Sequence, residues 1–351
     1  MPTAWRPLAA LAGAVLLWGT TFVVSERALA SMSPAVLTVA RFVLALVILI
    51  PLAARRGGLA TATRSAPVAL LGATGVAAYY GLQNLGLTST SAGTAAILQA
   101  VLPIATALIA LVWLGERLSA VTLAGLGLAT VGVALVAGGL AAEASVGAAL
   151  ITLGVLAYAL YTVLLRREPG RDPVVLPAAT CIWGVAFLLP WLAGEAVAGE
   201  ARLDLNAGAV ASLVYLGLVT SALTLLLWTY GAARVPAATA GVLIASIPAV
   251  GYLCAVIAGE PTSWGKTIGS LLALLGAALA AAAHSEPPTA TVEASAREPQ
   301  GEALALEQGG IEMVGRIGGS DEVAGQLEAD EADEGRDLGD GRRHAGGLEP
   351  G

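Results

Sequence analysis

Charged residues are scarce in this sequence, and their scarcity excludes an ordinary soluble protein. Only 12% of the residues are Asp, Glu, Lys or Arg, whereas 57% are hydrophobic and the mean hydropathy is +0.79. Soluble domains carry roughly 25% charged residues, and a soluble core could not hide this much apolar surface from water. The composition therefore predicts an all-α integral membrane protein, with the lipid bilayer as its surroundings.

Cysteine, histidine and the common catalytic motifs are also sparse or missing. Two isolated cysteines in apolar segments, Cys181 and Cys254, provide neither a disulfide framework nor a metal-ligand spacing. The sequence has no His-Glu-x-x-His zinc helix, no Gly-x-Ser-x-Gly elbow and no Gly-x-x-x-x-Gly-Lys-Ser/Thr phosphate loop. We therefore expect no enzyme, no ATP-driven pump, no metal and no cofactor. Without a dense basic patch, we expect no nucleic-acid partner.

The charges that do occur divide the sequence into two parts. Residues 285–351 hold 16 of the 25 acidic and 5 of the 18 basic residues, which leaves the tail near −11 and the apolar part near +4. Such a tail cannot bury enough apolar surface to offset the entropy lost on ordering. The sequence predicts a disordered acidic tail at 285–351.

The apolar part divides into ten candidate transmembrane helices, since a crossing needs roughly 20 apolar residues. The first run could also be a signal peptide, but nine more runs follow, so we interpret it as a retained helix. Nine basic residues fall on the side of the N-terminus and three on the other, which favours both termini in the cytoplasm of a multi-pass cell (inner) membrane protein. The ten ranges are 8–26, 34–54, 67–87, 92–114, 119–140, 146–166, 174–194, 207–230, 237–258 and 265–283.

An internal repeat relates the two halves of the apolar part. Each match alone is weak, and chance similarity between apolar helices is the alternative, but the matches run in order through both halves. We predict two five-helix repeats, at 1–142 and 143–284. The matched pairs include Trp18 with Tyr158, Ala40 with Ala179, Arg41 with Thr180, Gly72 with Gly217, Gly86 with Gly231, Thr94 with Thr239, and Pro103 with Pro248.

Five crossings is an odd number, so the second repeat would enter the membrane from the opposite side. Such inverted repeats suit alternating access, because each half can adopt the conformation of the other in turn. The substrate site is then expected near the midplane, between the halves.

Several short motifs resemble those of the EamA-type permeases within the drug/metabolite transporter superfamily. They are Leu-Trp-Gly-Thr-Thr-Phe at 17–22, Ala-Arg-Phe at 40–42, Gly-Leu-Thr-Ser-Thr-Ser-Ala-Gly-Thr-Ala-Ala at 86–96, Pro103, and Gly-Glu-Arg at 115–117. The resemblance covers about residues 8–283 and excludes the tail. It implies ten helices, cytoplasmic termini, and a central cavity lined by helices other than the fifth and tenth. Since members of the family export amino acids, metabolites and drugs, it does not specify the substrate.

Polar residues inside the spans are the candidates for substrate binding, because polar groups are costly in hydrocarbon and tend to face the bundle interior. Arg41 lies about 10 Å into the second helix at 1.5 Å per residue, and no acidic residue lies at comparable depth. It could attract a substrate carboxylate or phosphate, or it could snorkel outward or bond to a neighbouring helix. The other cavity candidates are Trp18, Tyr79, Gln83, Asn84, Gln99, Tyr158 and Trp228.

Pro103 and Pro248 are candidate gating residues, because each removes a backbone hydrogen bond and can kink its helix at a matching position of the two repeats. A static kink that only aids packing is the alternative. No Asp or Glu lies deep in a span, so the sequence shows no carboxylate proton relay.

These observations predict transport of a small-molecule substrate, most simply efflux of metabolites, amino acids or drugs. The rival function is a membrane receptor or scaffold that signals through the acidic tail. Deleting residues 285–351 would distinguish the two, since a transporter keeps its flux without the tail.

Overall fold

A computed structural model describes residues 5–114, 119–139, 146–165, 172–232, 234–235, 240 and 243–283. The predicted acidic tail at 285–351, together with Glu116 and Thr239, lies outside the described residues. In the first half the elements are α1 (Trp5–Leu29), α2 (Pro34–Arg56), α3 (Leu59–Thr63), α4 (Ala66–Gly72), η1 (Ala73–Ala78), α5 (Tyr79–Gly86), α6 (Ala92–Leu98), α7 (Val101–Leu114) and α8 (Ala120–Gly139).

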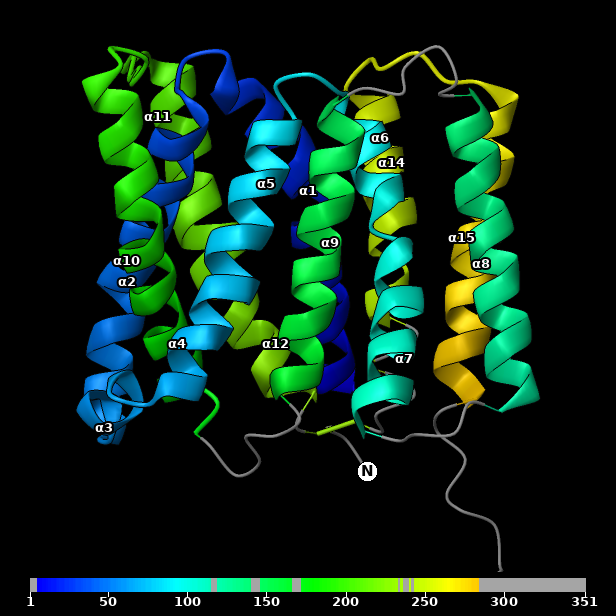
Figure 1. Cartoon of the computed structure of the whole chain (residues 1–351), viewed down its shortest axis with the longest axis horizontal. Coiled ribbons are helices and arrows are strands. Elements are labelled where there is room, and N and C mark those ends of the chain that lie inside the picture. Colours follow the sequence, from blue (N-terminus) through cyan, green and yellow to red (C-terminus); the bar gives the residue numbers. More distant parts are fainter. Residues whose placement is uncertain are drawn as a thin grey trace, which may run out of the picture. The chain divides into compact units, whose positions relative to one another are not determined.

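The second half repeats this order of long and broken helices (Figure 1). Its elements are α9 (Val146–Leu165), α10 (Val175–Val197), α11 (Ala207–Val214), η2 (Tyr215–Leu223), α12 (Thr224–Ala232), α14 (Ile247–Ile257) and α15 (Trp264–Ala283). The segments labelled η are π-helices, in which each backbone hydrogen bond spans one residue more than in an α-helix.

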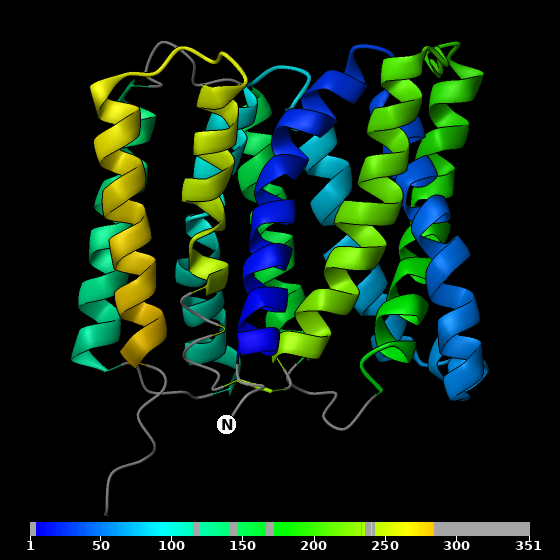
Figure 2. The same ribbon diagram turned by 180° about the vertical axis from the view of Figure 1, so that it is seen from behind.

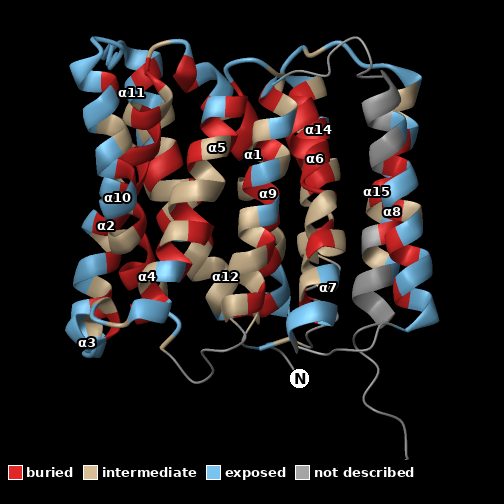
Figure 3. Cartoon of the chain, viewed as in Figure 1, coloured by how far each residue is buried: buried red, intermediate tan, exposed pale blue. Residues whose placement is uncertain are grey.

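Six helical stretches of the described residues are long and apolar enough to cross a membrane, and two shorter apolar helices accompany them. The outer faces of the helices carry large apolar side chains, such as Val112 and Ile257, each 77% exposed. Figure 3 shows such exposed positions along the outer helices and buried ones between the helices. Apolar surface of this extent matches a lipid environment rather than water. The chain is therefore a multi-span membrane protein.

The ends of the helices follow ordinary capping chemistry. Ser91 precedes α6 and accepts a hydrogen bond from the backbone N of Thr94 at 3.3 Å, and Asn206 precedes α11 and accepts one from Ala209 at 2.8 Å. Helix α2 ends where Gly57 adopts a positive φ of 78°, which glycine tolerates without steric cost.

Contacts between the halves are reciprocal. Helix α1 packs on α12 and α14, while its counterpart α9 packs on α5, α6 and α7. Two helices pack on their own counterparts, giving the pairs α2–α10 and α8–α15, while α6 packs on α14, the counterpart of α7. Figures 1 and 2 agree in placing α2 and α10 near one end of the helical bundle and α8 with α15 at the other. Exchanging the halves therefore leaves the α2–α10 and α8–α15 pairs unchanged.

In α8 and α15, two glycines at matching positions of the repeats make the same close contact with the partner helix. A Cβ atom on Gly132 would lie 2.4 Å from the backbone N of Ala273, and one on Gly276 would lie 2.3 Å from the backbone N of Ala129. Such distances are too short for any side chain, so both positions require glycine for the helices to approach. Gly127, also in α8, has no neighbouring atom within 4 Å of its Cβ position, so it makes no such contact.

The α2–α10 pair is joined at both of its ends, by different groups. At one end, Glu195 is 8% exposed and accepts hydrogen bonds from the Ser33 hydroxyl and from the backbone N of Ala35. These bonds satisfy donors at the start of α2.

At the other end of the pair, Asp172 accepts hydrogen bonds from the backbone N of Val174 and Val175 at 2.8 and 3.0 Å, and its carboxylate lies 4.0 Å from Arg56. Slight burial raises the pKa of Asp172, but the two backbone bonds and the Arg56 charge outweigh it, so its pKa is lowered overall.

Candidate functional site

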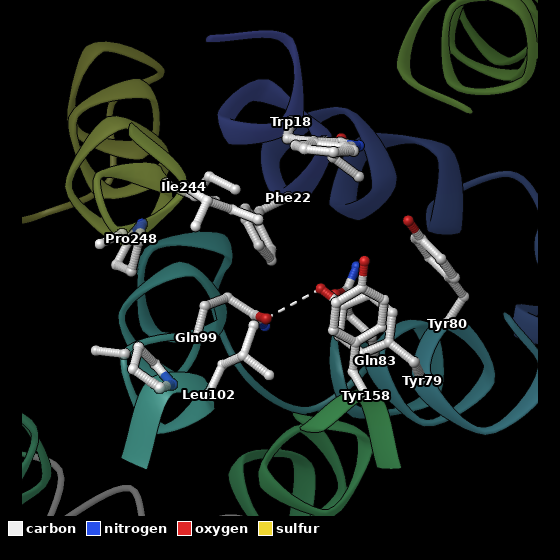
Figure 4. Close-up of a pocket in the computed structure, with 15 residues that line it drawn as sticks. Trp18, Phe22, Tyr79, Tyr80, Gln83, Gln99, Leu102, Tyr158, Ile244 and Pro248 are labelled. Carbon is white, nitrogen blue, oxygen red and sulfur yellow. Dashed lines mark hydrogen bonds between the residues drawn. The ribbon is translucent and has the colours of Figure 1, made fainter. Parts of the chain in front are cut away.

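A cavity of about 80 Å³ lies between the halves (Figure 4). The residues that line it come from α1, α5, the turn before α7, α7, α9, the helical residues 243–245 and α14, and none lies on α8 or α15. Its lining is formed by Trp18, Thr21, Phe22, Tyr79, Tyr80, Gln83, Gln99, Ala100, Leu102, Pro103, Tyr158, Ile244, Ala245, Ile247 and Pro248.

Matching residues of the two repeats face this cavity from opposite sides. Trp18 of α1 and Tyr158 of α9, which the repeat aligns, both line it. The alignment of Pro103 with Pro248 extends to three further lining pairs: Gln99 with Ile244, Ala100 with Ala245, and Leu102 with Ile247. The approximate two-fold relation between the halves therefore passes through the cavity.

Both prolines lie at helix breaks rather than within continuous helices. Helix α6 ends at Leu98, a turn follows, and Pro103 is in the first turn of α7; likewise Pro248 is the second residue of α14, after a turn at Ser246. A proline in the first turn gives up no intrahelical hydrogen bond, because that N–H has no partner in any case. The break in each helix lies just before the proline, and the gating role of the two prolines stays a prediction.

Aromatic side chains form most of one wall. The ring of Tyr79 lies 4.6 Å from that of Tyr80 and 4.6 Å from that of Tyr158, measured between centroids. Trp18 packs on Trp228 at 5.4 Å, so Trp228 supports the wall although it does not line the cavity. Aromatic pairs at these distances stabilise each other beyond the area they bury.

The three amide side chains that the sequence suggested have different surroundings. Gln99 accepts a hydrogen bond from the Tyr79 hydroxyl at 2.9 Å, shown dashed in Figure 4, and donates to the carbonyl of Ala95 at 3.3 Å. Asn84 lies outside the lining and donates to the Thr38 hydroxyl at 2.9 Å. Gln83 lines the cavity, and neither amide atom has a hydrogen-bond partner among the described residues.

Arg41 is fully buried beside the cavity rather than in its lining. Its Nη2 donates to the hydroxyls of Ser221 at 3.0 Å and Thr220 at 3.3 Å, both in η2, and its Nε donates to Ser221 at 3.2 Å. The guanidinium carbon lies 4.7 Å from the ring centroid of Tyr80, whose side chain does line the cavity, and 5.4 Å from that of Phe42. Arg41 thus contacts the neighbouring helix and supports the wall through a cation–π interaction.

Some lining residues were not among the sequence candidates. Phe22 lies four residues after Trp18 in α1, which places both on one face of the helix, so helical spacing could have identified it. Ile244, Ala245 and Ile247 carry no chemical signal of their own, and only their repeat partners indicate their position.

A second, wholly apolar crevice lies behind the aromatic wall, between α5, α7 and α9. Its lining alternates with that of the cavity: Ala78, Leu82 and Ala157 face the crevice, while the residue that follows each of them faces the cavity. The helices α5 and α9 therefore line both spaces, with neighbouring residues facing different ones.

Comparison with known proteins identifies the family. A model of the EamA-like transporter family matches residues 5–138 and again residues 145–282. A probable terminal-alkyne amino-acid exporter of Streptantibioticus cattleyicolor is 35% identical over 278 residues, covering 77% of this chain and 89% of the exporter. An uncharacterized transporter of Archaeoglobus fulgidus is 27% identical over 271 residues, covering 76% of this chain and 95% of that protein.

A solved crystal structure shares the fold, with a TM-score of 0.59 at 22% sequence identity over 78% of this chain and 96% of that one. The two family matches correspond to the two repeats, and the relatives are named as transporters rather than enzymes. This membrane protein therefore belongs to the EamA-like transporter family.

Proposed function

We propose that this chain exports small amino-acid-like metabolites through the central cavity by alternating access between two inverted five-helix repeats. The main support for the proposal is the lining of the cavity. Matching residues of the two repeats face this one space, namely Pro103 with Pro248 and Trp18 with Tyr158. A site on a two-fold axis can face either side when the halves exchange conformations. The named activity of the S. cattleyicolor relative supports an amino acid as the cargo.

The proposed topology has ten spans with both termini in the cytoplasm. The reciprocal packing of α1 and α9 supports inversion of the two repeats. A membrane-impermeant maleimide tests the orientation in whole cells, after Cys181 and Cys254 have been replaced by alanine. Arg202→Cys should react from outside, and Arg64→Cys should react only after the cells are opened. Labelling of Arg64→Cys in intact cells would contradict the topology.

Flux through the cavity is tested by counterflow in proteoliposomes preloaded with a terminal-alkyne amino acid. Wild-type protein should exchange labelled amino acid at least several-fold faster than empty liposomes. In cells, overexpression should lower accumulation of the same compound. Equal rates with and without protein, for this compound and for a panel of proteinogenic amino acids, would contradict the proposed cargo.

The two helix breaks before Pro103 and Pro248 support a gating role for these segments. A turn already interrupts each helix, so that its two parts can tilt without further loss of hydrogen bonds. Replacing Ala100 and Ala245 by cysteine and cross-linking them should stop exchange, and reduction should restore it, if the paired breaks move during transport. Unchanged exchange in the cross-linked protein would exclude that motion.

A further inference from the structure

Gln83 differs from every other amide near the cavity in that its hydrogen-bonding groups are free. The side chain is only 1% exposed, yet neither Oε1 nor Nε2 has a partner among the described residues. Gln99 uses both amide atoms within the protein. Asn84 has one free atom, its Oδ1, but it does not line the cavity.

A buried amide without partners is costly to the folded protein, because it gives up hydrogen bonds to water and gains none. Native proteins satisfy nearly all such groups, so an unpaired buried amide calls for a partner supplied from elsewhere. Since Gln83 lines the cavity beside Tyr79 and Tyr158 (Figure 4), the missing partner is most simply a bound solute. The amide offers an NH₂ group as donor and a carbonyl oxygen as acceptor, side by side.

The other lining residues restrict which solute can supply that partner. No Asp, Glu, Lys, Arg or His lies among them, so a solute with a net charge would lose its hydration without a counter-ion. Arg41, behind the ring of Tyr80, adds a positive potential that disfavours cations in particular. Trp18, Phe22 and Tyr158 favour an apolar side chain.

We infer that Gln83 is the specificity-determining residue of this transporter, and that it binds the zwitterionic head group of a net-neutral amino acid. Its Nε2 donates to the substrate carboxylate and its Oε1 accepts from the ammonium group, while the aromatic wall packs on the apolar side chain. This inference rests on the proposed transport of amino acids and adds the residue that selects the head group.

The test compares wild type, Gln83→Leu and Leu82→Met in proteoliposomes. Leucine removes both polar atoms at similar size. Leu82 is the neighbouring residue that faces the outer crevice, so its conservative exchange controls for disturbance of α5. Two quantities are measured: KM for a terminal-alkyne amino acid, and the thermal unfolding temperature in detergent.

Gln83→Leu should raise KM at least tenfold, because a site that loses its hydrogen bonds to a polar group discriminates strongly against it. It should also raise the unfolding temperature, since an unsatisfied buried amide has been removed. Leu82→Met should change neither quantity appreciably. The amide of the same amino acid, which is a cation, should compete at least tenfold more weakly than the zwitterion in wild type.

A lowered unfolding temperature together with an unchanged KM in Gln83→Leu would overturn the inference, because it would make Gln83 a packing residue. Equal competition by the zwitterion and the cation would overturn the assignment of the head group. Absence of exchange in wild type would instead contradict the proposed function, so the two failures are distinguishable.

Discussion

The two π-helical segments occupy matching places in the two repeats, yet different chemistry holds them. In the second repeat, η2 offers the hydroxyls of Thr220 and Ser221 to Arg41 of α2. In the first, η1 has Gly75 and Val76 at the aligned positions, and α10 carries Thr180 where α2 carries Arg41. Val76 instead packs against Gly184, whose Cβ would lie 2.3 Å from it.

The difference shows that the two-fold relation holds for the backbone and not for the buried charge. Gly72 meets the carbonyl of Thr180 as Gly217 meets the carbonyl of Arg41, at 2.8 and 2.9 Å from their Cβ positions. The close approach of the helices is therefore the same in both halves. An exchange of conformations between the halves would be symmetric in packing but not in electrostatics, so the two end states need not be equally stable.

The largest effect is expected from Thr180→Arg, which places a second cation against η1. Because Gly75 and Val76 carry no hydroxyl at the aligned positions, the guanidinium would lose the two acceptors that Arg41 has in η2, and a charge at the centre of a span costs about 3 kcal/mol or more. We expect a several-fold loss of folded protein in gel filtration. The matched variant Arg41→Thr removes a charge instead of adding one and should be milder. Equal yields of Thr180→Arg and wild type would show that the two sites are equivalent.

The glycine contacts between α8 and α15 allow the symmetry itself to be tested. Gly132→Ala and Gly276→Ala should each lower the free energy of unfolding by about 1–3 kcal/mol, as overpacking does elsewhere. Gly127→Ala, where the Cβ has space, should be neutral or slightly stabilising, since alanine favours the helix. Thermal unfolding in detergent measures all three. A loss confined to one of the two glycines would contradict the reciprocal packing.

The exposed end of the α2–α10 pair should respond to acid. Because the folded-state pKa of Asp172 is lowered, its stabilisation is present above the unfolded value near 3.9 and is lost as the pH falls through the folded value. Asp172→Asn should therefore lower stability at neutral pH by about 1 kcal/mol or less, and should flatten the stability profile below about pH 4. Glu200→Gln, an equal change of charge on an exposed side chain, is the control. An identical acid profile in Asp172→Asn and wild type would contradict the capping role.

The smallest effect is expected from deleting residues 285–351. Because both family matches end before the tail and the cavity is built from residues up to Pro248, counterflow should be unchanged. If the deletion abolished a signalling response of the cells but left transport unchanged, the result would instead favour a role of the tail in signalling.

The candidate residues show how far the sequence leads towards the site. Trp18, Tyr79, Gln83, Gln99 and Tyr158 were chosen as polar or aromatic residues within the spans, and all five line the cavity. Arg41, Asn84 and Trp228 satisfied the same criterion but contact neighbouring helices instead. Polarity at a given depth predicts that a side chain faces protein, but not which protein surface it faces. The π-turns, which shift the angular position of all residues after them, have no evident signal in the sequence.

The sequence by itself determined the membrane environment, the repeat and the family, because these depend on composition, order and motifs that survive without coordinates. Only the tertiary structure decided which amide side chain lacks hydrogen-bond partners within the described residues. Gln83, Asn84 and Gln99 have the same functional group, and their difference arises from the rotation of each helix and from whether Thr38 or Tyr79 lies within reach. A hydrogen bond depends on distances of a few ångströms between segments far apart in the chain. Helix packing fixes those distances, and the local sequence does not.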